Sequence, residues 1–499
     1  MPAPHSLATR AVRGAFWTGS PFVLQIAISL VFYGYLEIGD MGQFEWALIL
    51  VMLLALVTPL GLDHALVQRR DAADVHFSSA FWLSLALGLA VAGAVTATAP
   101  LTARYLGGEE PETFAAILRT MCWIVPFASV SGLLRARLQR DLQFRPIALA
   151  EVLSVVVYAA SAGVLLARGY GAMSPVISAV VREAALFAGL AWGAAWRPRL
   201  VFSAAALREL LAFGLNFTGS RCVNYLNSNL PRFLIFPLLG DAALGFYSFA
   251  YRLTLMPLVR ISTVITRVAF PAFATIQDDL AQLRRGYLRT VKTIGLSFWP
   301  VLAVLFAVAP EGCGLLRQLN DQDLTPALLP LRLLALAAVV KAVGTPVGSI
   351  FLARGKASWS FYWSLFSFAV LMPALYWGAG QGVWGVCAVI AISAVLFLGL
   401  SQHLANRLVE MGFATYLSAL ARPAAVTAAL AAVLWVTRRI LPASPTAALG
   451  LQVVAAAVAG LALLRLLAWS DLAELWRDVR GRGNVDASSS AAPDPHSQA

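Results

Sequence analysis

The chain has 499 residues, of which 60% are hydrophobic and only 12% are charged, and its net charge is +12. Because a soluble protein carries about 25% charged residues, this composition excludes a soluble globular enzyme and places most of the chain in a lipid bilayer. The four cysteines and five histidines are scattered. We therefore expect no disulfide framework, no metal site and no cofactor.

Apolar runs of about twenty residues, the length that crosses a bilayer core as a helix, follow one another along the chain. They predict an all-α polytopic membrane protein, because a helix satisfies its own amides in lipid. In chain order, about fourteen spans are expected: 15–36, 43–66, 78–99, 114–136, 147–167, 174–196, 210–239, 242–272, 288–309, 327–352, 359–377, 383–404, 418–437 and 446–469.

Arginine and lysine gather in alternate loops, and this asymmetry predicts orientation. One side holds both termini and many basic residues, among them Arg10, Arg69, Arg137, Arg140, Arg285 and Arg477. The other side is acidic, with Glu37, Asp40, Glu110 and Glu311, although Arg438 and Arg439 also fall there. Both termini are therefore expected in the cytoplasm, and no nucleic-acid partner is expected, because the basic loops form no single stripe.

A motif occurs twice, as "GDMGQFEWALIL" from Gly39 and as "GDAALGFYSFAYR" from Gly240. "FWTGS" at 16–20 likewise returns as "NFTGS" at 216–220. Two parallel six-helix lobes are therefore predicted, although alanine-rich helices also resemble one another by composition. The expected organisation is a cytoplasmic N-terminus at 1–14, lobes at 15–200 and 201–404, a helix pair at 405–470 and a largely disordered cytoplasmic tail at 471–499.

The stretches "GAFWTGS", "LGLDHALVQRRD", "FGLNFTGSRCVNYLNSNL" and "LLGDAALGFYSFAYRL" resemble bacterial polysaccharide exporters of the multidrug/oligosaccharidyl-lipid/polysaccharide flippase superfamily. The resemblance covers about the first 400 residues. It implies a MATE-like, two-lobed transporter in the inner membrane. Such a protein flips undecaprenyl-diphosphate oligosaccharides for lipopolysaccharide, capsule or exopolysaccharide synthesis, by alternating access that an ion gradient drives.

Basic residues inside the spans are candidate substrate ligands, because a charge at mid-helix costs about 2.5–3.5 kcal/mol. At about 100° per residue, Arg221 shares one helix face with three polar residues: Asn224, Asn227 and Ser228. Arg252 lies near mid-membrane in the next span, with Arg260 at the edge of its polar face, and Lys341 and Arg119 are expected to add to the wall. Guanidinium groups suit a diphosphate and amides suit sugar hydroxyls. Alternatively, Arg221 and Arg252 pair with helix carbonyls or a nearby acid.

Three carboxylates are candidates for ion coupling: Glu183, Glu45 and Glu151. A carboxylate in a dry site can exchange a proton. The alternative for Glu183 is a local ion pair with Arg182 or with a neighbouring helix.

Two other functions compete with the flippase. A MATE-type antiporter for drugs or small molecules would need a more acidic cavity. A membrane-embedded glycosyltransferase or polymerase would need a sizeable outer loop, and the outer loops here are short. We expect no enzymatic activity, a monomer, and, besides the lipid-linked substrate and the bilayer, polysaccharide polymerases or glycosyltransferases as partners.

Overall fold

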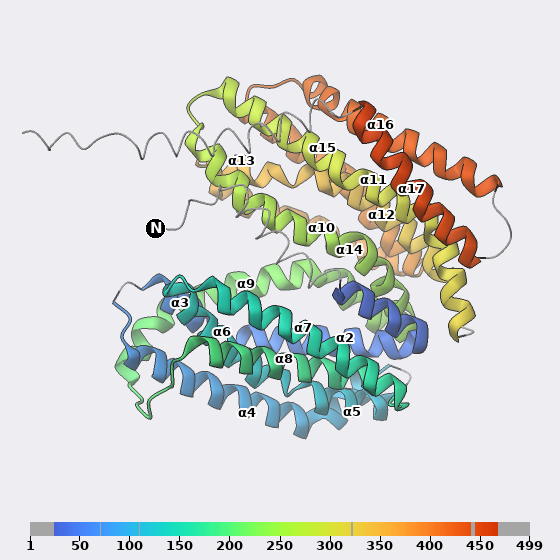
Figure 1. Ribbon diagram of the computed structural model, residues 1–499. Helices are drawn as coiled ribbons and strands as arrows, with labels where there is room; N and C mark the ends of the chain where they lie inside the picture. The colour runs from blue at the N-terminus through green and yellow to red at the C-terminus, as the bar shows by residue number, and fades with distance from the viewer. Residues whose placement is uncertain (1–23, 70, 109, 321–322, 441–444, 468–499) are drawn as a thin grey trace, which may run out of the picture.

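The computed structural model describes residues 24–69, 71–108, 110–320, 323–440 and 445–467. Within these residues the secondary structure is helical, and Figure 1 shows the helices in two groups. The N-terminal segment expected at 1–14 and the tail expected at 471–499 lie outside the described residues.

The first group contains the helical segment Leu24–Tyr35 and eight labelled helices: α2 (Ile38–Val57), α3 (Leu62–Gln68), α4 (Asp74–Leu106), α5 (Pro111–Met121), α6 (Ile124–Arg140), α7 (Phe144–Ala167), α8 (Met173–Ala194) and α9 (Ala204–Leu239). The second group contains α10 (Asp241–Thr275), α11 (Leu280–Asn320), the 3₁₀ turn η1 (Thr325–Ala327), α12 (Leu328–Gly344), α13 (Pro346–Ala353), α14 (Ala357–Ala379), α15 (Val383–Leu408), α16 (Phe413–Ile440) and α17 (Pro445–Leu467).

The expected spans coincide with these helices, and the first of them is described from residue 24. Three expected spans are each divided into two helices: α2 and α3, α5 and α6, and α12 and α13. Gly61, with φ of 68°, precedes α3, and Pro346 begins α13, so local backbone chemistry explains two of these breaks. Ten helical stretches of the described chain are long and apolar enough to cross a membrane.

The two groups share one hydrophobic core at the end where α2 and α10 begin. This core contains Phe44 and Ala47 of α2 together with Tyr247 and Ala250 of α10. Towards the other end the cores are separate: one is built from α3, α4, α6, α7, α8 and α9, and another from α10, α11, α12, α13, α15 and α16. The groups are therefore joined by apolar packing chiefly at one end.

The repeated motif forms the closest part of this junction. A Cβ on Gly42 of α2 would overlap the backbone oxygen of Asp241, and a Cβ on Gly245 of α10 would overlap the backbone oxygen of Ile38. The same spacing of 203 residues separates Gly42 from Gly245 and Ile38 from Asp241. The contact is therefore reciprocal, and small residues let the two helix backbones meet, as in membrane helix pairs generally.

Arg438 of α16, which does not fit the charge asymmetry of the loops, forms an ion pair with Glu311 of α11. Its Nε lies 2.9 Å from Oε1 of Glu311, whose side chain is 11% exposed. Arg439 lies over the ring of Trp435, with 4.6 Å between the guanidinium carbon and the ring centroid. The two arginines that break the loop asymmetry are thus held by local contacts.

Candidate functional site

Arg252 of α10 and Glu45 of α2 form an ion pair between the two groups of helices. Arg252 donates from Nε to Oε1 of Glu45 at 2.8 Å and from Nη2 to the same oxygen, and its Nη1 donates to Ser29. The side chains of Arg252 and Glu45 are only 13% and 3% exposed. In this conformation Arg252 is paired with a nearby acid, which was the alternative left open by the sequence.

The partner of Arg252 is itself a candidate residue, since Glu45 was expected to take part in ion coupling. A buried ion pair offsets the large desolvation cost of each charge only while both partners remain in contact. Any anion that approaches Arg252 must therefore compete with Glu45. The two residues belong to one site, although the sequence assigned them separate roles.

A second candidate surface follows α9. Arg221 and Asn227 are half-buried and Asn224 and Ser228 are exposed, although all four lie mid-way along a helix of 36 residues. The guanidinium of Arg221 lies 6.0 Å from the ring centroid of Phe217. α9 is long enough to cross a membrane, but it is not one of the ten stretches that are also sufficiently apolar, because its middle is polar.

Arg232 continues this polar face and was missed by the sequence analysis. It lies eleven residues after Arg221, which returns to nearly the same helix face at 100° per residue. Its guanidinium carbon lies 4.1 Å from the ring centroid of Tyr251, and its Nη1 donates to Asn229 at 2.9 Å. Its buried Nε has no hydrogen-bond partner among the described residues. We name Arg221, Asn224, Asn227, Ser228 and Arg232 the α9 polar face.

α9 belongs to the first group and borders the second. It packs against α2, α3 and α4 of the first group and against α10, α14 and α15 of the second. Near its N-terminal part, Gly214 meets Gly61 so closely that a Cβ on either would overlap the other chain segment. Further along, Tyr225 donates to the backbone oxygen of Ile49 at 2.9 Å. The α9 polar face is thus held by a helix that contacts both groups.

The remaining basic candidates are not brought into this cluster by any described contact. Lys341 is exposed in the middle of the membrane-crossing stretch Thr325–Ala353, and Arg119 is exposed near the end of α5. Arg260 lies on α10, but its side chain is outside the described residues. Their expected role as part of one binding wall stays a prediction.

The other two acidic candidates lie apart from Arg252. Oε1 of Glu151 on α7 lies 2.9 Å from Nη1 of Arg135 on α6. Glu183 of α8 is 9% exposed, and the described ion pairs of the first group do not include a bond between it and Arg182. Of the three carboxylates, only Glu45 is joined by a described contact to a basic candidate.

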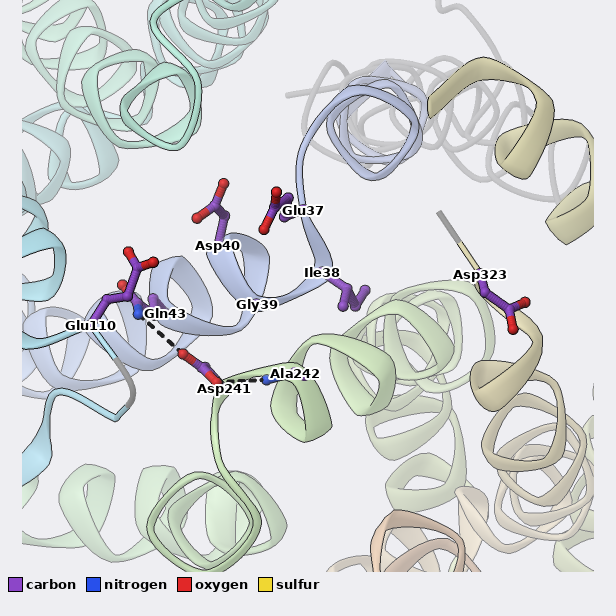
Figure 2. A pocket seen from close by; sticks show the side chains of 9 residues that line it. All are labelled: Glu37, Ile38, Gly39, Asp40, Gln43, Glu110, Asp241, Ala242 and Asp323. Carbon is purple, nitrogen blue, oxygen red and sulfur yellow. Dashed lines mark hydrogen bonds between the residues drawn. The ribbon is translucent and has the colours of Figure 1, made fainter. Parts of the chain in front are cut away.

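A pocket of about 350 Å³ opens where α2 and α10 begin (Figure 2). Its lining includes Asp40 and Asp241, one from each copy of the Gly-Asp motif, and Gln43, whose Nε2 donates to Oδ2 of Asp241 at 3.1 Å. The sequence placed several of these acids on one side of the membrane but did not predict that they share a pocket.

Comparison with known proteins gives a family match. A family model described as "Polysaccharide biosynthesis protein" matches residues 35–316. The lipopolysaccharide biosynthesis protein WzxC of Escherichia coli (strain K12) is 28% identical over 380 residues, which cover 75% of this chain and 76% of the relative. The teichuronic acid biosynthesis protein TuaB of Bacillus subtilis (strain 168) is 25% identical over 434 residues, covering 85% and 88%. The succinoglycan biosynthesis transport protein ExoT of Rhizobium meliloti (strain 1021) is 26% identical over 367 residues, covering 71% and 72%.

Two solved structures share the fold. An inward closed conformation of the lipid II flippase MurJ superposes with a TM-score of 0.74 at 13% identity, covering 92% of this chain and 99% of that one. An inward-facing multidrug resistance MATE family transporter of the MOP superfamily superposes with a TM-score of 0.62 at 16% identity, covering 82% and 97%. These similarities confirm the all-helical, MATE-like fold expected from the sequence.

Proposed function

The chain belongs to the polysaccharide biosynthesis protein family, and from that premise we propose that it is a flippase for lipid-linked oligosaccharide units. It is a multi-pass membrane protein with a transporter fold, and its relatives are named for lipopolysaccharide, teichuronic acid and succinoglycan synthesis or transport. The proposed substrate is an undecaprenyl-diphosphate oligosaccharide, which crosses the bacterial inner membrane by alternating access.

The observation that carries this proposal is the α9 polar face. A helix of 36 residues is about 54 Å long, enough to cross the membrane. Charged and amide side chains at its middle are costly in lipid and are placed there for a ligand or a water-filled path. Arg221 and Arg232 supply guanidinium groups, which bind phosphate oxygens in pairs. Asn224 and Asn227 supply amides suited to sugar hydroxyls.

The Arg252–Glu45 pair suggests how binding is coupled to an ion. A diphosphate that reaches Arg252 replaces one anion by another, so the arginine keeps a partner. Glu45 is then left buried without its cation, and protonation removes the cost of its charge. We propose that this exchange links substrate entry to proton uptake at Glu45.

The orientation proposed from the loops has both termini in the cytoplasm. In that orientation the shared core closes the outer end of the molecule, and the separate cores lie towards the cytoplasm, where lipid-linked units are assembled. Further parts of this proposal are a helix pair at 405–470, a monomeric state and cooperation with a polymerase or glycosyltransferases. We also propose the two lobes that the repeat predicts, at 15–200 and 201–404; this boundary counts α9 with the second lobe, although α9 packs against helices of both groups.

The second candidate is a small-molecule antiporter of the same superfamily. The MATE similarity favours it, but at 16% identity that similarity concerns the fold alone. The α9 polar face is basic, whereas a carrier of cationic drugs would be expected to present acids along its path.

The proposed function is tested in a deletion strain and in proteoliposomes. Deletion is expected to abolish surface polysaccharide and to leave lipid-linked units in the inner leaflet, and complementation restores export. Purified protein in liposomes is expected to move a fluorescent lipid-diphosphate oligosaccharide between leaflets and not a cationic dye. Polymer at normal levels in the deletion strain, or transport of the dye alone, would overturn the proposal.

A further inference from the structure

The pocket in Figure 2 is rich in acidic side chains. Five of its nine lining residues are carboxylates, and none is a lysine, arginine or histidine: the acids are Glu37, Asp40, Glu110, Asp241 and Asp323. Among the described residues no ion pair involves any of the five. These like charges repel one another, and the repulsion destabilises the contact between the two groups of helices.

The acids come from both sides of that junction. Asp40 lies in the first turn of α2 and Glu110 immediately precedes α5, both in the first group. Asp241 begins α10, and Asp323 lies just before η1, both in the second group. Whatever neutralises these carboxylates therefore acts on both groups at once.

A buried amide gives an independent indication of a ligand. Gln43 is only 2% exposed, and while its Nε2 donates to Asp241, its Oε1 is buried with no hydrogen-bond partner. Figure 2 shows this amide between Asp241 and Glu110. Turning the amide over would set its oxygen against the Asp241 carboxylate instead, so neither orientation satisfies the group. An oxygen facing carboxylates is satisfied by a cation or by water that a cation holds.

We propose that this pocket binds a hydrated divalent cation, Mg²⁺ or Ca²⁺, that bridges the two groups of helices. Carboxylate and amide oxygens are the ligands that such hard cations prefer. Water occupies about 30 Å³ per molecule in the liquid, so a pocket of about 350 Å³ has room for an ion with its inner water shell. No three His, Cys, Asp or Glu side chains of the described chain converge to coordinate a metal directly. The ion therefore keeps most of its waters.

This site is independent of the transported substrate. It lies at the end where α2 and α10 begin, in contact with the glycine junction: a Cβ on Gly42 would strike Asp241 itself. The bound cation stabilises the arrangement in which the two groups meet at that end, and its removal favours their separation there.

The test uses the full-length protein in nanodiscs, stripped of metal with a chelator. Adding MgCl₂ or CaCl₂ is expected to raise Tm saturably by about 2–4 °C. NaCl at the same ionic strength is expected to have no such effect. Comparing the half-saturating concentrations of the two salts identifies the preferred ion. The double variant Asp40→Asn, Asp241→Asn keeps the side-chain shapes and is expected to abolish the response.

The matched control is Glu112→Gln, since Glu112 lies in the first turn of α5 beside the pocket but does not line it. Its response is expected to equal that of the parent protein. Should the double variant fail to fold, Glu110→Gln, which alters a residue outside the helices, is expected to raise the half-saturating concentration at least about tenfold. An equal rise in Tm in the parent and in the pocket variants, or a rise reproduced by NaCl, would overturn the proposal.

Discussion

Arg252 donates two hydrogen bonds to Glu45 across the junction of the two groups of helices, although 207 residues separate them in the chain. The repeat does not produce a second, equivalent pair. The spacing that relates Gly42 to Gly245 relates Glu45 to Ser248 and Ile49 to Arg252. The arginine that ends the second copy of the motif thus lies against a glutamate of the first copy.

Replacing one partner of this pair is expected to destabilise the fold strongly, whereas replacing both partners is expected to destabilise it little. Arg252→Met leaves Glu45 buried without its cation and is expected to lower the unfolding free energy by about 3–5 kcal/mol. In Arg252→Met, Glu45→Leu most of this loss is expected to return. The measurement is thermal unfolding in detergent, read as a double-mutant cycle.

The pair Arg135–Glu151 provides the control for that cycle. Its side chains are 36% and 40% exposed, and pairs of this kind contribute about 0–1 kcal/mol. A coupling energy for Arg252 and Glu45 no larger than that of the control would contradict the role given to the buried pair.

The glycine junction is expected to tolerate no side chain. Gly42→Ala places a methyl group on the backbone of Asp241, so the helices must separate, at a cost of about 1–3 kcal/mol. Gly93→Ala in α4 is the control, because no atom lies within 4 Å of its new Cβ. Thermal unfolding of the two variants checks this, and equal Tm values would show that α2 and α10 do not meet through these glycines.

Neutralising the α9 polar face is expected to stop export. Losing one charge-assisted hydrogen bond costs about 1.5–3 kcal/mol, or at least about tenfold in affinity. The variant Arg221→Ala, Arg232→Ala should therefore produce little surface polysaccharide at a normal membrane level. The single variant Arg232→Lys should export more polysaccharide than the double variant but less than the parent protein. Its ammonium group keeps the positive charge but cannot bind two phosphate oxygens side by side as a guanidinium does.

Arg199→Ala is the matched control for these variants, because Arg199 has a 72% exposed side chain in the loop before α9. It should export normally. Full polymer from the double variant would leave Arg221 and Arg232 as structural residues and remove the main support for a diphosphate site on α9.

The proposed orientation is checked by reporter fusions. Fusions after Arg140 and Arg285 should give a cytoplasmic signal, whereas a cysteine at Glu112 should react with a membrane-impermeant thiol reagent added outside. A periplasmic signal after Arg285 would mean that the two halves are not parallel.

The helices could be predicted from the sequence because runs of twenty apolar residues leave the backbone few alternatives in lipid. The polar face around Arg221 was also predictable from helical spacing, and the same spacing extends it to Arg232, beyond the expected end at Ser228. The Arg252–Glu45 pair could not be predicted, because no period links positions 207 residues apart. The acidic pocket could not be predicted for the same reason, because its lining residues lie near the starts of helices that are far apart in the chain.

The reciprocal glycine contact has a consequence for the origin of the molecule. Two surfaces that meet as residue i on j and j on i are those of an isologous, two-fold symmetric dimer. A six-helix protein with this surface would pair with a second copy of itself in parallel, and fusion of two gene copies would need no new interface. Once fused, the halves were free to differ. A homodimer must place every charge twice about its axis, whereas this chain carries Glu45 and Arg252 once, on one side of the junction, and so has a charge asymmetry there that two identical subunits could not provide.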